Sequence, residues 1–384
     1  PPEGYQALNT ANTRPETVIS RPDQYVGIVT YKGNESTQDV SGLNFNDKPD
    51  LVWIKQRPSP NQNNFLYDTV RGAGRSLRSS TDAQEQGPNT GADGDLRTFN
   101  LNGFSLGSGQ GGTGSGAVNQ NAKDIVAWCW KAGGSKNTFN VDDVGYASAA
   151  AAGLSGGSIT PTAASVGTKQ GFSIIKYEGA GGSQTIPHGL QNIPQFIICK
   201  KINASESWGV YHESIGNDKR LALNSTDGQT STTTWNSTTP TSTVFSVGAA
   251  SLSNTDGDDY IAYLWHDVPG LQKFGTYEGN GSTDGPYVEL GFRPAVLLRK
   301  SIDSTRDWSI VDSVRNKFNP MPDFLRPNGN DAETGTGYAD VDFLSNGFKV
   351  RTDGAVTNSS STTYIYAAWA EAPSVDLYGG GANA

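Results

Sequence analysis

One pattern recurs three times along the chain, with its landmarks in the same order each time. Each copy opens with a run that ends in Tyr-x-Gly, and a proline follows fifteen or sixteen residues after that glycine. An apolar run that ends in lysine comes directly after the proline. The prolines are Pro49, Pro194 and Pro294, and the lysines are Lys55, Lys200 and Lys300. Such an ordered recurrence indicates three diverged copies of one unit.

The apolar runs within each copy are short, β-branched and aromatic, and residues typical of turns separate them. The run after each proline is apolar at nearly every position, which predicts a strand buried on both faces. Each copy closes with an aromatic-rich run, at 125–130, 260–265 and 364–369, that mixes large and small side chains as strands between packed sheets do. We therefore predict an all-β fold of three tandem antiparallel β-sandwiches, jelly-roll-like, that each close their own core.

The copies also predict domain boundaries. Four prolines and few apolar residues lie in 1–24, which suggests an extended arm that is either disordered or ordered on a partner chain. The predicted division is an N-terminal arm (1–24), repeat 1 (25–132), a Gly/Ala/Ser-rich linker (133–170), repeat 2 (171–269), repeat 3 (270–375) and a flexible tail (376–384).

Net charge and hydropathy limit the kinds of molecule that we expect the chain to bind. The net charge is −9, from 38 acidic and 29 basic residues, whereas nucleic-acid binding needs clustered Lys and Arg. No apolar run reaches the roughly 18 residues of a membrane-spanning helix. Cys129 and Cys199 lie inside apolar runs and are expected to be buried free thiols. We expect no nucleic-acid partner, no membrane insertion and no cofactor.

Signals for catalysis are weak. The histidines, His188, His212 and His266, all lie in the second copy at positions that the other copies do not share. No closely spaced pair of acids recurs among the copies, as a glycoside hydrolase would require. We predict a protein that is not an enzyme, with no catalytic residues.

Two groups of residues are candidates for binding. Asp256, Asp258 and Asp259 form an acidic loop that could hold calcium, although an Asp-Gly turn explains it as well. Aromatic side chains in polar surroundings could stack on sugar rings or belong to the core. These aromatic candidates are Trp208, Tyr211, Trp235 and Trp308. The three equivalent lysines are expected to extend their ammonium groups to solvent or to pair with a local acid.

Several longer segments carry a resemblance to a known family. They are Gln184–Leu190, Tyr260–Tyr277, Asp342–Lys349 and Tyr364–Tyr366. With them, residues 25–375 resemble repeat-bearing, tail-fibre-like virion proteins of marine tailed bacteriophages, a family that is largely uncharacterised. Copy one departs from the family pattern, because it reads Val40-Ser-Gly-Leu43 where copy two has Pro-His-Gly-Leu.

The resemblance implies a structural protein on the exterior of a phage particle, made in the host cytoplasm. The hypothesis it favours is a tail fibre or tail-associated attachment protein that contacts a host-surface glycan. A capsid decoration protein anchored by residues 1–24 is the alternative, and a surface-glycan depolymerase is a minor one. Either leading hypothesis implies other virion proteins as partners and a homo-oligomer.

Overall fold

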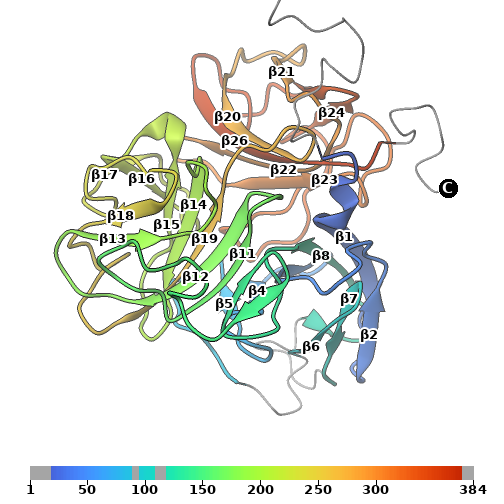
Figure 1. Ribbon diagram of the computed structural model, residues 1–384. Helices are drawn as coiled ribbons and strands as arrows, with labels where there is room; N and C mark the ends of the chain where they lie inside the picture. The colour runs from blue at the N-terminus through green and yellow to red at the C-terminus, as the bar shows by residue number, and fades with distance from the viewer. Residues whose placement is uncertain (1–18, 89–94, 109–117, 374–384) are drawn as a thin grey trace, which may run out of the picture.

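A computed structural model of the chain describes residues 19–88, 95–108 and 118–373 (Figure 1). Within these residues the fold is built from strands, with short 3-10 turns such as η1 (Pro22–Gln24) and η3 (Glu213–Ile215). No helix of the described residues is long and apolar enough to cross a membrane. The predicted all-β class is confirmed, and apart from one parallel pair, β9 with β11, neighbouring strands run antiparallel.

Unit 1 consists of a larger and a smaller sheet. The larger sheet has the order β1-β8-β3-β4-β5, formed by β1 (Val26–Lys32), β3 (Leu51–Gln56), β4 (Asn64–Asp68), β5 (Leu77–Arg78) and β8 (Asp124–Trp130). The smaller sheet has the order β2-β7-β6, formed by β2 (Gln38–Ser41), β6 (Leu96–Asn100) and β7 (Gly103–Leu106).

Unit 2 repeats this order within a nine-stranded sheet, β10-β9-β11-β12-β19-β14-β15-β16-β17. Its own strands are β12 (Phe172–Glu178), β14 (Phe196–Lys201), β15 (Gly209–His212), β16 (Lys219–Ala222), β17 (Thr230–Ser231) and β19 (Asp259–Trp265). The smaller sheet pairs β13 (Gln184–Pro187) with β18 (Val244–Val247).

Unit 3 has a larger sheet of order β20-β26-β22-β23 and a smaller one of order β21-β25-β24. The larger sheet contains β20 (Gln272–Glu278), β22 (Pro294–Ser301), β23 (Ser309–Asp312) and β26 (Thr363–Ala370). The smaller sheet contains β21 (Tyr287–Glu289), β24 (Val341–Leu344) and β25 (Gly347–Val350). In every unit the closing strand therefore lies between the first strand and the strand that follows the proline.

The segment 133–170, predicted to be a linker, instead contains three strands. They are β9 (Phe139–Val141), β10 (Val144–Tyr146) and β11 (Ala163–Gly167). β11 pairs along the outer edge of β12 and is buried at every position. Its small side chains, Ala, Ala, Ser, Val and Gly, allow this close packing, so the composition that suggested a flexible tether belongs to a packed strand.

The larger sheets are buried on both faces, which explains why their strands are so continuously apolar. One face of each packs on its own smaller sheet, around a local core: in unit 1 this core includes Val52, Tyr67 and Phe104. Units 2 and 3 have local cores of the same kind. The other face of all three larger sheets meets in one shared core. The predicted burial of the strands after each proline is confirmed.

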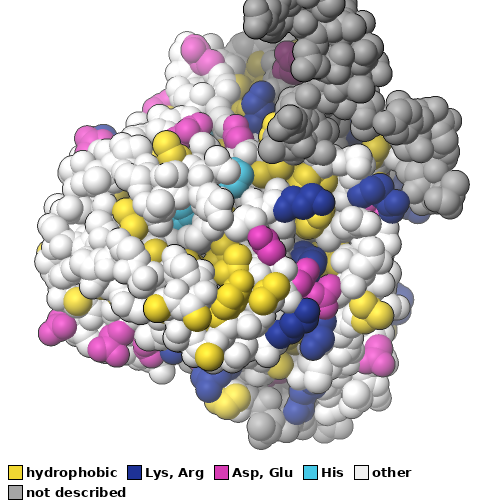
Figure 2. All heavy atoms as spheres, in the orientation of Figure 1, with side chains coloured by type: hydrophobic (Ala, Val, Ile, Leu, Met, Phe, Trp, Pro, Cys, Tyr) yellow, Lys and Arg dark blue, Asp and Glu magenta, His cyan; other side chains and the backbone are white. Residues whose placement is uncertain are grey.

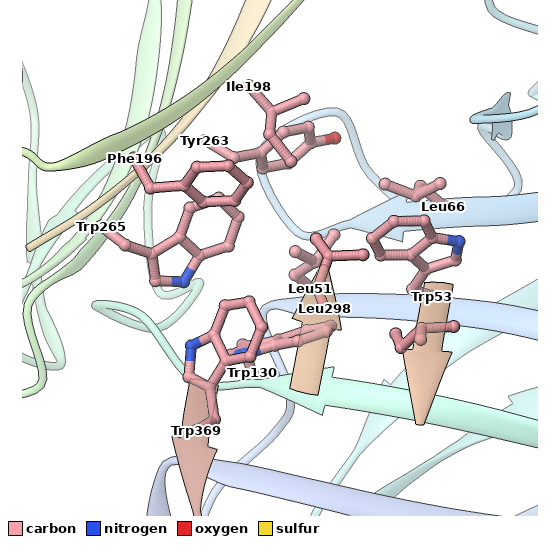
Figure 3. A pocket seen from close by; sticks show the side chains of 11 residues that line it. Leu51, Trp53, Leu66, Trp130, Phe196, Ile198, Tyr263, Trp265, Leu298 and Trp369 are labelled. Atoms are coloured by element: carbon pink, nitrogen blue, oxygen red, sulfur yellow. The ribbon is translucent and has the colours of Figure 1, made fainter. Parts of the chain in front are cut away.

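The shared core makes the chain a ring of three units, seen as three lobes around a common centre in Figure 1. The centre of the shared core contains three tryptophans, each the last aromatic residue of a closing strand: Trp130, Trp265 and Trp369 (Figure 3). Their ring centroids are 5.2 to 6.4 Å apart, in edge-to-face arrangement. Beside them is an apolar cavity of about 10 Å³. Each unit therefore has a local core, and a further core, which the sequence did not predict, joins all three.

Backbone contacts repeat around this ring. The amide of Gln62 donates to the carbonyl of Asn330, that of Glu206 to Asp82, and that of Arg306 to Thr226, at 2.8 to 3.1 Å. A reciprocal set joins Glu85 to Ile202, Gln229 to Ile302 and Glu333 to Arg57. Unit 2 thus binds unit 1, unit 3 binds unit 2, and unit 1 binds unit 3 by the same contacts. The arrangement is that of a cyclic trimer in one chain.

The ends of the chain are described in part. Of the predicted arm 1–24, residues 1–18 lie outside the described residues, whereas Ile19 is buried in the shared core and its amide donates to the carbonyl of Pro269 at 3.1 Å. The arm is therefore anchored from Ile19 onward. The predicted tail 376–384 lies outside the described residues.

Candidate functional site

The four aromatic residues predicted to contact a sugar are buried. Trp208, Tyr211, Trp235 and Trp308 are each at most 2% exposed. The indole of Trp208 donates to the carbonyl of Arg78 at 3.0 Å, and that of Trp308 donates to Ala222 at 2.9 Å. Two of the four residues therefore join neighbouring units, and the prediction of sugar stacking is wrong for all four. The polar flanks of Trp208 and Trp308 belong to the boundaries between units, since Glu206 donates to Asp82 and Arg306 to Thr226.

The equivalent lysines are also buried, contrary to the expectation of solvent or an acid. The Lys200 ammonium donates to the carbonyls of Asp82 and Glu206, at 3.1 and 2.8 Å. The Lys300 ammonium donates to Thr226 and Arg306, both at 2.9 Å. Lys200 and Lys300 thus each join their own unit to the preceding one, whereas Lys55 donates to the Gln62 carbonyl of its own unit. Burial lowers the pKa of all three ammonium groups to about 8.

The acidic loop is held by nearby cations of the chain itself. The Asp258 carboxylate accepts from Lys201 at 2.7 Å and from Asn203 at 3.1 Å, which lowers its pKa. Asp259 lies 3.5 Å from the Lys176 ammonium. Across residues 19–88, 95–108 and 118–373, no group of three or more His, Cys, Asp or Glu side chains is placed to hold a metal ion.

The surface carries a groove at the boundary between units 2 and 3, with a volume of about 480 Å³. We call it the Tyr338 groove. Its lining consists of Thr226, Thr305, Arg306, Asp307, Gly337, Tyr338, Gly354, Ala355 and Val356. Tyr338 is 54% exposed, so part of its side chain is accessible to a ligand. A groove on unit 2, lined by Asp218, Arg220, Ser231, Thr232, Thr233 and Leu252, has no aromatic side chain.

Short backbone contacts fix the loop that presents Tyr338. The amide of Gly337 donates to the Asp340 carboxylate at 2.8 Å, and the Thr352 hydroxyl donates to the Gly337 carbonyl at 2.9 Å. Gly354 is required here, because a Cβ at this position would lie 2.7 Å from the Tyr338 carbonyl. A ring held on a fixed backbone pays little entropy on binding a ligand.

Charged groups stand beside this ring. The Asp307 carboxylate accepts from Asn328 and Arg326, at 2.8 and 2.9 Å, and is thereby fixed in place. One terminal nitrogen of Arg306 donates to the Thr305 carbonyl at 3.1 Å. Its Nε is buried out of reach of a ligand, so a ligand hydroxyl or carboxylate would meet the two terminal nitrogens of this half-buried side chain, which carry four N–H groups.

This set of groups suits a carbohydrate. An aromatic ring covers the apolar face of a sugar, while a guanidinium and threonine hydroxyls bond its hydroxyl groups. The face in Figure 2 carries basic and acidic side chains interspersed on the side of unit 1 and mainly uncharged groups over β13 and β16–β18. A surface of this kind selects ligands by local contacts rather than by a broad field of one sign.

Sequence reasoning missed Tyr338 and Arg306. A usable signal was present, because Tyr338 follows Gly335-Thr-Gly337 in a loop that lacks the alternation of a strand. An aromatic residue in a Gly-rich loop is more often exposed than one in a β-branched run. Arg306 could not be placed without knowing that units 2 and 3 meet there.

Comparisons with known proteins identify a family and no more. A family model described as a domain of unknown function (DUF7483) matches residues 21–373. No curated protein matches the chain.

Proposed function

Because the chain belongs to the DUF7483 family, whose function is unknown, we propose its role from its geometry and from the resemblance noted in its sequence. It is a virion protein on the exterior of a tailed phage, part of a tail fibre or tail-associated structure, that attaches to a host-surface glycan. The same proposal treats the three units as tandem jelly-roll-like copies, with the N-terminal arm as the anchor.

The observation that carries the binding role is the Tyr338 groove. It places an exposed tyrosine, a half-buried guanidinium and two threonine hydroxyls on one rigid boundary. The rigid support comes from the Lys300 and Arg306 contacts to unit 2, which hold both walls of the groove together. Binding sites presented by loops on a rigid scaffold are common in β proteins.

Binding of the purified protein to polysaccharide from candidate host cells tests the proposal. Tyr338→Ala is expected to weaken binding about tenfold, through loss of the stacking surface. Tyr287→Ala is the matched control, because Tyr287 is 45% exposed on β21 of the same unit but does not line the groove. Absence of binding to any host-surface glycan, or equal loss in both variants, would contradict the attachment role.

A capsid decoration role is the second candidate, and the ring of three units favours it. A body with threefold character matches threefold or sixfold positions of a symmetric shell. Localisation in a phage particle separates the two candidates: density on capsomers supports decoration, and density on the tail supports attachment.

A further inference from the structure

The first strand of every unit meets the preceding unit in the ring, and this junction is completed differently in each case. The equivalent residues at the outer edge of these strands are Ile28, Ile174 and Phe274, which pair with Trp128, Tyr263 and Ala367 of the closing strands. An outer edge presents unpaired backbone N–H and C=O groups, so it needs partners.

Between units 1 and 2, a strand completes the edge. β11 pairs with β12, and Ser165 lies opposite Ile174. The buried side chains of Leu154 and Val166 lie against Gly189, within about 3.0 Å of the place where a Cβ of that glycine would lie. On the other side, the backbone N–H of Gly134 donates to the Asp50 carboxylate of unit 1 at 3.1 Å. The segment 133–170 therefore fills this junction.

Between units 2 and 3, a side chain completes the edge. The Asp267 carboxylate accepts from the backbone N–H of Phe274 at 2.8 Å. The backbone N–H of Asp267 in turn donates to the Gln195 side chain at 2.7 Å. The short connection between β19 and β20 leaves no room for a strand and uses a carboxylate instead.

Between units 3 and 1, no strand or side chain of the described residues pairs with the edge, which lies along a groove of about 460 Å³. We call it the β1 groove. Its walls are Asp23, Val26–Ile28 and Gly42–Asn44 from unit 1, and Ala295, Ser313, Val314 and Ala370–Ala372 from unit 3. Glu371 is the counterpart of Asp267, but it is turned toward Arg293, 2.5 Å away.

The backbone of β1 faces this opening. Hydrogen bonds at Tyr25 and Gly33 direct the odd-numbered residues toward β8. In an antiparallel pair the alternate residues then point outward, so Ile28 and Thr30 present their N–H and C=O groups to the open edge. Among the described residues, no hydrogen bond reaches these outward groups of Ile28 or Thr30.

We propose that the β1 groove docks an extended segment of another protein chain, which adds to β1 as β11 adds to β12. The groove continues the interface that already joins the units, and strand addition supplies the backbone partners that β1 lacks. The two carboxylates of its walls, Asp23 and Glu371, are each paired with an arginine of the chain, so the groove needs no charge on the segment. The segment is of the same kind as Ala163–Gly167, the strand with small, uncharged side chains that completes the equivalent edge of unit 2.

A peptide with the sequence of residues 161–169 serves as the probe, labelled for fluorescence anisotropy. Saturable binding to the full chain is expected, together with at least tenfold slower amide exchange at Ile28 and Thr30. A peptide with proline in place of Ser165 lacks the N–H that faces the edge and is expected to bind at least tenfold more weakly. Equal binding of the two peptides, or none of the first, overturns the proposal.

Two variants of the chain guard against loss of folding. Ser313→Arg fills the groove, and Thr30→Pro removes one outward N–H while leaving the bonds to β8 intact. Both are expected to keep the thermal midpoint and weaken the peptide at least tenfold; unchanged binding in both contradicts docking at β1. Slow exchange at Ile28 and Thr30 in the free protein, lost on deletion of residues 1–18 or 374–384, shows that the chain's own end fills the groove and also overturns the proposal.

Discussion

Trp128 of unit 1 donates its indole N–H to the carboxylate of Asp312 in unit 3, at 2.9 Å, inside the protein. Asp312 also pairs with Arg315 at 2.5 Å, and both side chains are fully buried. Arg315 extends the chain of charges to Glu333, again at 2.5 Å. A tryptophan of unit 1 is therefore hydrogen-bonded to a group of three charged residues in unit 3.

The same relationship recurs between units 2 and 1. The Tyr263 hydroxyl, at the position of Trp128, donates to Asp68 at 2.7 Å. Asp68 pairs with Arg71, and Arg71 lies 3.1 Å from Glu85. In unit 2 the equivalent residues are His212, Ile215 and Gln229, so all three charges are absent together. This joint replacement follows from the cost of leaving any one buried charge unpaired.

Removing one charge of a triad is expected to cost more than removing all three. Arg315→Met leaves the buried Asp312 without its cation, while Glu333 keeps its pair with Arg57, and the expected loss in free energy of unfolding is about 3–5 kcal/mol. The triple variant Asp312→His, Arg315→Ile, Glu333→Gln copies unit 2 and is expected to lose less. Urea unfolding of both variants decides; a triple variant less stable than Arg315→Met would contradict this reading.

The buried lysines give stability a dependence on alkaline pH. In the folded chain the pKa of Lys55, Lys200 and Lys300 is about 8, below the ordinary value of 10.5. Between these values the unfolded chain binds more protons than the folded one, so the lysine contribution to stability rises with pH. Burial of Cys129 and Cys199 raises the pKa of their thiols and acts in the opposite direction above about pH 9.

A variant separates the two effects. Replacing the three lysines by methionine removes the lysine contribution to the pH dependence of stability and leaves both thiols in place. Between pH 7.5 and 9, the free energy of unfolding of the natural sequence is expected to rise relative to that of the variant. Urea titrations at these pH values provide the measurement, and parallel pH profiles for the two proteins would refute the assignment to the lysines.

How far the sequence predicts this molecule depends on whether a contact is local. The order of strands along the chain follows from Pro49 and Lys55 and their counterparts. Hydrophobic patterns and turn residues mark each strand because they act within a few positions of the sequence. Burial of these strands on both faces was also predictable from their continuous apolar runs. What the second face packs against was not, since a single unit contains no sign that Trp130 meets Trp265 and Trp369.

The candidate site was less predictable than the fold. Trp308 looked like a ligand contact because its neighbours are polar, yet its own indole and the nearby Arg306 form hydrogen bonds across a unit boundary. Tyr338 and Arg306 come together only when units 2 and 3 assemble, and a boundary between distant segments leaves no local pattern. The prediction that 133–170 is a linker failed for a related reason, because small side chains suit both flexible linkers and closely packed strands.

The buried histidines predict loss of stability in acid. Burial lowers the pKa of His188 and His212 to about 4. Between the ordinary value of 6.5 and about 4 the unfolded chain binds more protons, so stability falls as the pH drops through this range. His212 lies 3.4 Å from the Tyr366 carbonyl and accepts from the Ser214 amide, so it is held neutral.

His212→Gln tests this assignment, since glutamine can occupy the site without titrating. The natural sequence is expected to lose free energy of unfolding between pH 7 and 5, and the variant to lose measurably less. Chemical unfolding at each pH gives both slopes, and identical slopes would exclude His212 as a contributor.

Removing one unit is expected to destabilise the other two, because the three share a core. Without residues 270–384, Trp130 and Trp265 lose the ring of Trp369, and the inner faces of β8 and β19 meet water. The remaining fragment is expected to bind an apolar dye and to unfold at a lower urea concentration than the full chain. Trp235→Ala is the control for simple loss of packing, because Trp235 belongs to the local core of unit 2. A fragment that stays monomeric, binds no dye and keeps the midpoint of the full chain would indicate three independent domains.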